Sequence, residues 1–307
     1  MSAIITAANQ LVKQYAADEK SAAFITEMFA TIADEDSRGE FSPFVLSYDA
    51  EAIAAGATSY RLGTTSFWNI RDGVIDPARI QYYISMFGAE SSPLVMDIEA
   101  WDLKTEWDVA GPNLQLAARM WSEGSSRPIG FYAIMPDVQY WYFVLLARAI
   151  AEANAYDIVK YSANISSWMT RNDRTYAMLG QYVDFLVPRV YVLYSDDSNN
   201  PFSDWKLYAT SAIQEAVRIA NGKPVYPMMA PQVGGATEPL LETEWINALQ
   251  YVFSLPGVSG VAIYSGGTDP VLYNWVTAIA DTLRDLHGLL LIDGTLLLLA
   301  DTTGLIG

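Results

Sequence analysis

Short apolar segments alternate with longer amphipathic segments over most of the chain after residue 38. Seven runs rich in apolar and β-branched residues are short enough to be strands, and they cover residues 43–50, 59–65, 92–101, 127–134, 184–194, 223–229 and 258–266. Strands that alternate with helices are typical of parallel sheets, because each helix then forms a crossover to the next strand. The pattern predicts an α/β fold with about seven strands.

The segment that begins at Trp205 predicts a helix with one apolar face. Its apolar residues follow Trp205 by 3, 4, 7, 8, 11, 12 and 15 positions, which places them along one side of a helix. Ile246, Leu249 and Phe253 mark a second helix, and Pro270 opens a third.

Parallel strands can form an open doubly wound sheet or a closed barrel. No Gly-rich phosphate loop follows an early strand, so nothing in the sequence favours a nucleotide-binding open sheet. We therefore predict a distorted (β/α) TIM-like barrel. It would occupy residues 39–286, after an N-terminal helical segment at residues 1–38.

The last 21 residues, 287–307, have a different pattern. Two Leu-rich runs flank Asp293-Gly294, a dipeptide typical of hairpin turns, and the segment contains no Lys or Arg. An exposed apolar hairpin is prone to association, so we expect it to pack on the barrel or on another chain. The second alternative predicts a homo-oligomer, or a virion component, assembled through this segment.

Composition and charge narrow the possible chemistry. The chain has no Cys and one His, so thiolate sites and multi-histidine metal sites are excluded, and we predict neither a metal nor a cofactor. A net charge of −17 argues against nucleic acid as a partner. Catalysis would then depend on carboxylates, Tyr and the backbone.

The first 20 residues lack the basic start, apolar run and cleavage site of a signal peptide. No run reaches the roughly 18 apolar residues of a membrane span, so no membrane association is expected. We predict synthesis in the cytoplasm, with release by another route such as lysis.

Asp97 and Glu99 form the clearest candidate for chemistry. They follow the apolar run Leu94–Met96 with i, i+2 spacing, which puts both side chains on one side of an extended strand. The carboxyl ends of barrel strands carry the active site. Two adjacent carboxyls also raise the pKa of one member, as a general acid near neutral pH requires. A solvated pair of acids at a strand end is the alternative.

Five short motifs in order resemble the hyaluronidase family of glycosidases. D-I-E-A-W (97–101) is similar to that family's D-W-E-x-W strand, and G-F-Y-A-I-M-P-D (130–137) to its G-Y-Y-x-F-P-D strand. P-R-V-Y (188–191) resembles P-S-I-Y, and A-V-R-I-A-N-G-K-P-V-Y-P (216–227) resembles an arginine-containing helix that leads to P-V-x-x-Y. G-V-S-G-V-A-I-Y (257–264) is similar to G-A-S-G-I-V-I-W.

The resemblance covers roughly residues 43–284 and implies a distorted barrel of about seven strands. It implies that Glu99 is the general acid and that Asp97 holds the substrate's own N-acetyl group, which acts as the nucleophile in a retaining mechanism. The implied sugar-binding residues are Trp101, Tyr132, Asp137, Tyr191 and Tyr264.

Several of these residues have structural alternatives. Tyr132 and Tyr191 could fill the barrel interior, and Asp137 could cap the next helix. Asp137 also stands one residue further from Tyr132 than in the family pattern, and Tyr264 replaces a Trp. The family's disulfides are absent, since the chain has no Cys.

Two classes of function follow from these observations. The first is a hyaluronidase-like endo-N-acetylhexosaminidase that cleaves a neutral polysaccharide or a bacterial surface glycan, because a charge of −17 disfavours hyaluronan. The second is a catalytically silent barrel that serves as a structural or glycan-binding part of a bacteriophage tail or virion.

Overall fold

The computed structural model describes residues 10–33, 45–47, 53, 58–63, 74–193, 202–233 and 239–264. Residues 10–15 are helical. The larger helices are α2 (Glu19–Ala33), α5 (Pro77–Phe87), α6 (Trp107–Gly124), α7 (Trp141–Ala151), α8 (Ala155–Leu179), α9 (Phe202–Ala220) and α10 (Glu242–Phe253), and a 3-10 turn, η1, covers Gly180–Tyr182. The strands are β1 (Val45–Ser47), β2 (Thr58–Ser59), β3 (Arg61–Gly63), β4 (Leu94–Met96), β5 (Ile129–Phe131), β6 (Met228–Met229) and β7 (Val261–Ile263).

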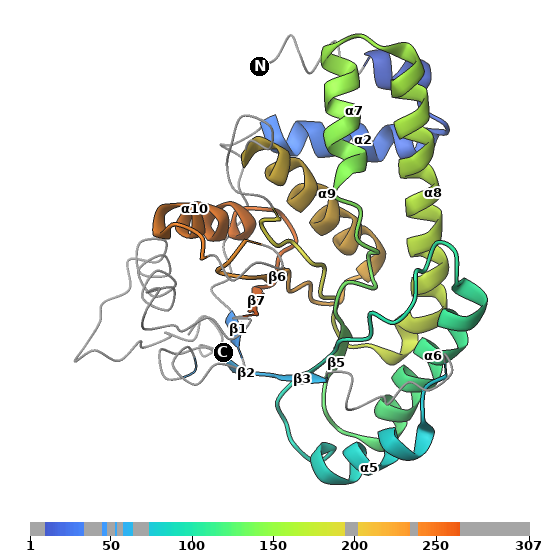
Figure 1. Cartoon of the computed structure of the whole chain (residues 1–307), viewed down its shortest axis with the longest axis vertical. Helices are drawn as coiled ribbons and strands as arrows, with labels where there is room; N and C mark the ends of the chain where they lie inside the picture. The colour runs from blue at the N-terminus through green and yellow to red at the C-terminus, as the bar shows by residue number, and fades with distance from the viewer. Residues whose placement is uncertain are drawn as a thin grey trace, which may run out of the picture.

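The strands form two parallel sheets. The first has the order β2-β1-β7-β6 and the second the order β3-β4-β5. Figure 1 shows the strands near the middle of the molecule, with α9 and α10 on one side and α5 and α6 on the other. The predicted α/β class with parallel strands is confirmed, whereas the described strands do not form one closed barrel sheet.

The run at 184–194 explains part of this difference. It makes isolated parallel bridges, Tyr132 with Val187, Leu186 with Val225 and Arg189 with Met228, instead of a continuous strand. Pro188 lies in the middle of the run and has no N–H group to donate to a sheet ladder. These bridges nevertheless connect the β5 segment to the β6 segment.

The two faces of β4 contact different cores. Leu94 and Met96 belong to an apolar cluster with Ile84 and Trp121 of α5 and α6. Val95, which points to the opposite face, belongs to a second cluster that contains several tyrosines. One side of β4 therefore packs on the helices α5 and α6, and the other side faces the cluster that contains the tyrosines.

Local sequence signals set the helix boundaries. Asp76 precedes Pro77, and its carboxylate accepts hydrogen bonds from the first-turn N–H groups of α5. The predicted apolar stripe beginning at Trp205 is buried along α9. The predicted helix around Leu249 is α10, and Gly257, with φ +82°, allows the chain to turn after it.

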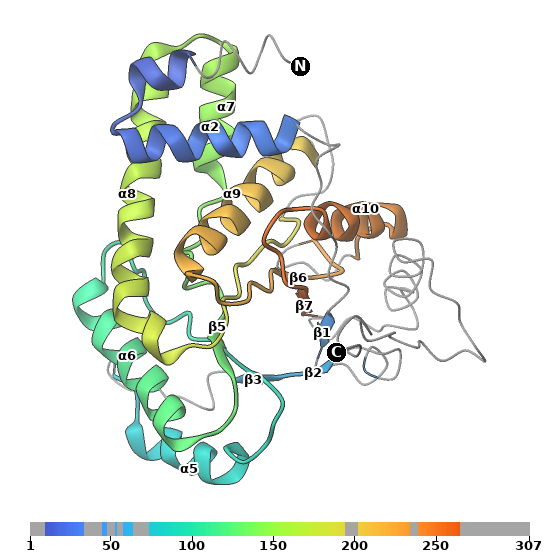
Figure 2. The same cartoon turned by 180° about the vertical axis from the view of Figure 1, so that it is seen from behind.

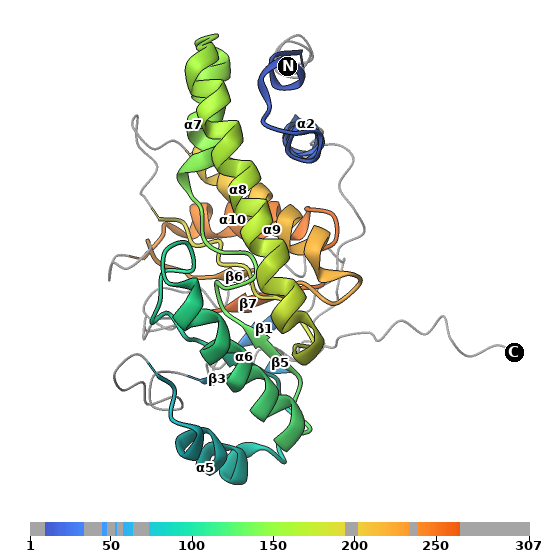
Figure 3. The ribbon, with the colours of Figure 1, turned by 90° about the vertical axis from the view of Figure 1, so that its right-hand side faces the viewer.

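The helices α2, α7 and α8 pack together at one end of the molecule. Phe24 of α2 makes edge-on contacts with Phe143 of α7 and Trp168 of α8. Figures 2 and 3 show α8 extending from this end to α6. The predicted N-terminal helical segment thus contributes α2 to this packing.

Several predictions fall outside the described residues. They are the helix beginning at Pro270 and the Leu-rich segment 287–307. Within the described ranges, no helix is long and apolar enough to cross a membrane. Among the same residues, no group of three or more His, Asp or Glu side chains is arranged to hold a metal ion.

Replacing Gly130 by Ala is expected to lower the free energy of unfolding by about 1–3 kcal/mol, the usual cost of overpacking. A Cβ atom there would lie 2.5 Å from the Phe185 ring and 2.8 Å from the Phe185 backbone oxygen. Urea unfolding of the two proteins measures the change. An unaltered midpoint would show that β5 and the 184–194 run are not packed this closely.

Candidate active site

Asp97 and Glu99 come directly after β4, at its carboxyl end. The Asp97 N–H donates to the Gly63 carbonyl oxygen at 2.9 Å, which extends the β4–β3 pairing by one residue. The Asp97 side chain is partly buried and Glu99 is exposed. Ile98, between them, is buried in the cluster that faces α5 and α6. The two carboxyls therefore stand on the opposite side of the chain from Ile98.

The two carboxyl groups interact. Burial raises the pKa of Asp97 to about 6, and the charge of Glu99 adds to the increase. The i, i+2 spacing predicts that one of the two carboxyls has a raised pKa, and that this carboxyl is the general acid. In the structure the raised pKa belongs to Asp97, because Asp97 is the more buried of the two residues.

Asp97 is expected to make stability fall as the pH rises from about 4 to about 6. Its pKa is higher in the folded chain than in the unfolded chain, so the folded state binds more protons within this window. Relative to Asp97→Asn, the wild-type folding equilibrium should become less favourable by about fiftyfold between pH 4 and pH 7, because the folded pKa of about 6 lies well above the ordinary value of 3.8. Urea unfolding at both pH values gives this ratio.

Asp102→Asn is a control, because Asp102 should change the stability of the fold with pH in the opposite direction to Asp97. The Lys104 backbone N–H and the Thr105 hydroxyl bind the Asp102 carboxylate and hold its pKa below the usual range. The stability that Asp102 contributes is present at neutral pH and lost as the pH falls. If Asp97→Asn showed no pH dependence relative to wild type, Asp97 would not be shielded from water as described.

Three tyrosines form a row beside the carboxyl ends of neighbouring strands. Tyr132 follows β5 directly, Tyr264 follows β7 directly, and Tyr191 lies in the run between them. The ring centroids of Tyr132 and Tyr191 are 5.9 Å apart, and those of Tyr191 and Tyr264 are 6.0 Å apart with nearly parallel planes. Carboxyl ends of parallel strands share one edge, so these rings and Asp97 belong to the same edge.

The electrostatics connect the tyrosines to the carboxyl pair. Burial raises the pKa of the Tyr132 phenol; the charge of Glu99 raises this pKa further, while Arg189 lowers it. The pKa of Tyr191 is also raised, first by burial and then by Tyr132. Glu99 and Tyr191 are thus close enough to Tyr132 to influence the ionisation of its hydroxyl.

The two remaining predicted site residues, Asp137 and Trp101, have their described contacts outside the row of tyrosines. The Asp137 carboxylate lies 3.4 Å from the Arg171 guanidinium and accepts a hydrogen bond from Gln139, and Trp168 donates to the Asp137 carbonyl oxygen. Burial raises the Asp137 pKa while Arg171 opposes the increase. Trp101 packs at the edge of the cluster facing α5 and α6.

Sequence reasoning missed two residues of this region. Tyr60 is the residue that joins β2 to β3, and its hydroxyl donates a hydrogen bond to the Ile263 carbonyl oxygen at 3.1 Å. Arg189 stands over the Tyr191 ring, with 5.7 Å from its guanidinium carbon to the ring centroid. The i, i+2 spacing from Arg189 to Tyr191 was a signal that could have identified the arginine.

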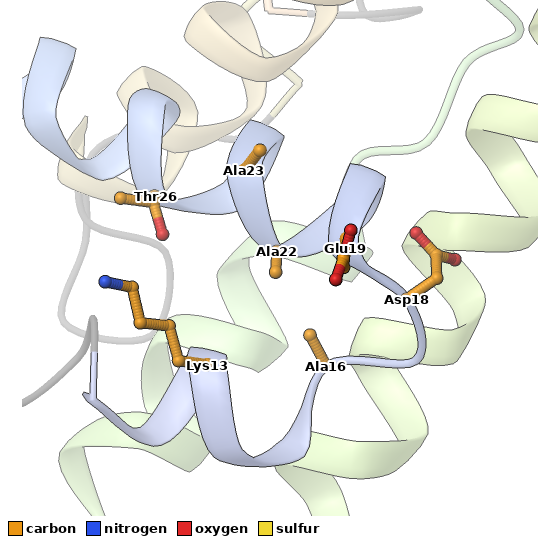
Figure 4. Close-up of a pocket in the computed structure, with 7 residues that line it drawn as sticks. All are labelled: Lys13, Ala16, Asp18, Glu19, Ala22, Ala23 and Thr26. Atoms are coloured by element: carbon orange, nitrogen blue, oxygen red, sulfur yellow. The ribbon is translucent and has the colours of Figure 1, made fainter.

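A separate pocket of about 460 Å³ lies at the N-terminal helices (Figure 4). Lys13 projects toward it from residues 10–15, while Glu19 and Thr26 face it from α2. A second cavity of about 420 Å³ lies between α2, α8, α9 and the turn at Gly257. None of the predicted site residues lines either pocket.

The crystal structure of bee venom hyaluronidase has a similar fold. The two chains superpose with a TM-score of 0.51 and 13% sequence identity, over 80% of this chain and 98% of that one. A crystal structure of bee venom hyaluronidase in complex with a hyaluronic acid tetramer matches with a TM-score of 0.44 and 16% identity, over 69% of this chain and 75% of the other. No protein-family model and no curated protein sequence matches the chain.

Proposed function

We propose that the chain is a glycoside hydrolase that cleaves glycans containing N-acetylhexosamine. The observation that supports this most strongly is the interacting pair Asp97 and Glu99 beside a row of tyrosines, at one edge of parallel strands. Carboxyl groups supply the acid and the charge stabilisation that glycoside hydrolysis requires. Aromatic rings supply flat apolar faces for sugars.

In the proposed mechanism Glu99 protonates the glycosidic oxygen as the bond to the anomeric carbon breaks. The carbonyl oxygen of the substrate's 2-acetamido group forms the new bond to that carbon, and the bond electrons leave with the departing oxygen. Asp97 accepts a hydrogen bond from the acetamido N–H and balances the positive charge that develops there. Water then attacks the anomeric carbon as the bond from that carbon to the acetamido oxygen breaks, which restores the acetamide, and Glu99 takes the proton of the water.

The environments of the two carboxyls suit these different roles. Asp97 is partly buried, so its interaction with a developing positive charge is weakly screened by solvent. Glu99 is exposed, so it can reach a glycosidic oxygen and exchange protons with water between turnovers. The tyrosine row lies next to the pair and would line the sugar-binding subsite.

We also infer a distorted barrel from the strand pairings. β1 pairs with both β2 and β7, and β7 pairs with β6. The bridges at Val187 and Arg189 continue the order from the β5 segment to β6, and β4 joins β5 to β3. Since β2 and β3 are separated by Tyr60 alone, the neighbours follow one another around a ring.

A neutral glycan or a bacterial surface glycan is the substrate class that the charge favours. The chain carries −17, and a polyanion such as hyaluronan would approach against that field. The experiment is release of reducing ends from a panel that includes N-acetylglucosamine oligomers, hyaluronan and glucose polymers. Turnover of the first is expected; no turnover of any acetamido-containing glycan would refute the proposal.

A glycan-binding barrel without catalysis is the second candidate. It is favoured by Asp137, whose carboxylate is engaged by Arg171 and Gln139. In this case N-acetylglucosamine oligomers would bind in calorimetry but would not be cleaved, and a structural role in a virion would then be the better proposal.

A further inference from the structure

Asp137 lies in a tight turn that follows Tyr132, at the carboxyl end of β5. An antiparallel bridge between Ile134 and Asp137 closes the turn, and the Ala133 N–H donates to the Val187 carbonyl oxygen at 3.1 Å. The Asp137 side chain is 20% exposed, so solvent reaches its carboxylate. The turn therefore joins one ring of the tyrosine row to an accessible carboxylate.

One face of α8 holds this turn. The Asn172 side-chain oxygen accepts a hydrogen bond from the Asp137 N–H at 3.0 Å, and the Trp168 Nε1–H donates to the Asp137 carbonyl oxygen at 2.7 Å. Arg171, between them in the sequence, places its guanidinium 3.4 Å from the Asp137 carboxylate. Residues three and four apart share one face of a helix, so all three side chains meet the same residue.

The two backbone contacts set the direction of the Asp137 side chain. The N–H and the carbonyl group belong to the two peptide planes on either side of the Asp137 Cα atom. With both planes held, the direction of the Cα–Cβ bond is set as well. Arg171 and Gln139 both contact the Oδ2 atom of the carboxylate, and among the described residues no group donates to Oδ1. Oδ1 is therefore the oxygen that can accept from a ligand.

A buried carboxylate orients the Asn172 amide. The Asn172 Nδ2–H donates to the Glu215 Oε1 atom of α9 at 2.9 Å, while the amide oxygen faces the Asp137 N–H. Asn172 and Glu215 are both fully buried. This position needs a donor at one end and an acceptor at the other, and an amide supplies both.

We propose that Asn172 and Trp168 are positioning residues, which hold the main chain of Asp137 so that its Oδ1 atom accepts a hydrogen bond from a sugar hydroxyl of a bound glycan. The glycan part of this inference rests on the proposed function, whereas the contact between α8 and the turn does not. Two experiments therefore test the two parts separately.

Amide hydrogen exchange, followed by NMR, tests the contact without any substrate. In Asn172→Ala the Asp137 N–H loses its acceptor, so its exchange rate should rise by about tenfold or more. The Tyr132 N–H, which donates to the Met96 carbonyl oxygen within the sheet, is the internal control and should keep its wild-type rate. An unchanged exchange rate at Asp137 overturns the proposal.

Kinetics on N-acetylglucosamine oligomers test the positioning with a milder variant. Trp168→Phe keeps an aromatic ring and leaves the buried Asn172–Glu215 contact in place, but it loses the N–H that holds the Asp137 carbonyl oxygen. It should raise KM about threefold or more and change kcat less than about twofold, because Asp137 would contact a sugar and not the bond that breaks.

Ile165→Val, which shortens another buried side chain of α8, is the control and should keep the wild-type KM. A wild-type KM in Trp168→Phe overturns the positioning role. If the wild-type chain binds the oligomers without cleaving them, the dissociation constant from calorimetry takes the place of KM in the same comparison. If it neither binds nor cleaves them, the proposed function and the glycan part of this inference both fail, and hydrogen exchange still decides whether α8 holds the turn.

Discussion

Replacing Glu99 by Gln is expected to lower kcat by about 10²–10⁴-fold, the usual contribution of a general acid. Gln has nearly the same shape but cannot protonate the departing oxygen. Because Glu99 is exposed, the variant should keep the wild-type melting temperature. Initial rates on N-acetylglucosamine oligomers, at saturating substrate, measure the loss.

Glu123→Gln is the matched control for this experiment. Glu123 is an exposed residue near the end of α6, and its replacement changes the net charge by the same amount. The control should retain wild-type kcat. Equal rates in Glu99→Gln and wild type would remove Glu99 from the catalytic role, whatever the substrate.

Replacing Glu215 by Ala is expected to lower the free energy of unfolding by about 3 kcal/mol, as when one partner of a buried ion pair is removed. Its side chain is fully buried in α9 and accepts two hydrogen bonds from Arg218 and one from Asn172. The loss should lie at the lower end of the usual range, because Arg218 also pairs with Asp173 at 2.8 Å.

Urea unfolding measures this change, with Glu123→Ala as the exposed control, expected within about 0.5 kcal/mol of wild type. Glu215→Gln should lose less than Glu215→Ala, because an amide oxygen can still accept from Asn172. An unchanged midpoint in Glu215→Ala would show that the buried network does not stabilise the fold. The same Asn172 accepts the Asp137 N–H, so the network also supports the turn after β5.

Much of the secondary structure could be predicted from apolar periodicity. The stripe beginning at Trp205 gives α9, and the spacing of Ile246, Leu249 and Phe253 gives α10. All seven apolar runs contain strands or parallel bridges. The i, i+2 rule also placed Asp97 and Glu99 opposite Ile98. These features depend on local geometry, which the sequence encodes directly.

Other features depend on partners distant in sequence. The pKa of Asp97 is raised because the fold buries it, and no local pattern could distinguish it from Glu99. Asp137 pairs with Arg171, 34 residues away on α8. The division into two sheets follows from the short pairings around Pro188 and from the break at Tyr60 between β2 and β3, which periodicity alone could not reveal.

The anomeric configuration of the first product tests the central claim most directly. Wild-type protein is mixed with N-acetylglucosamine oligomers, and the newly formed reducing end is followed by proton NMR before mutarotation. The proposed attack by the acetamido group predicts that the product first appears with the configuration of the substrate. An inverted first product, or no product from any acetamido-containing glycan, would contradict the account.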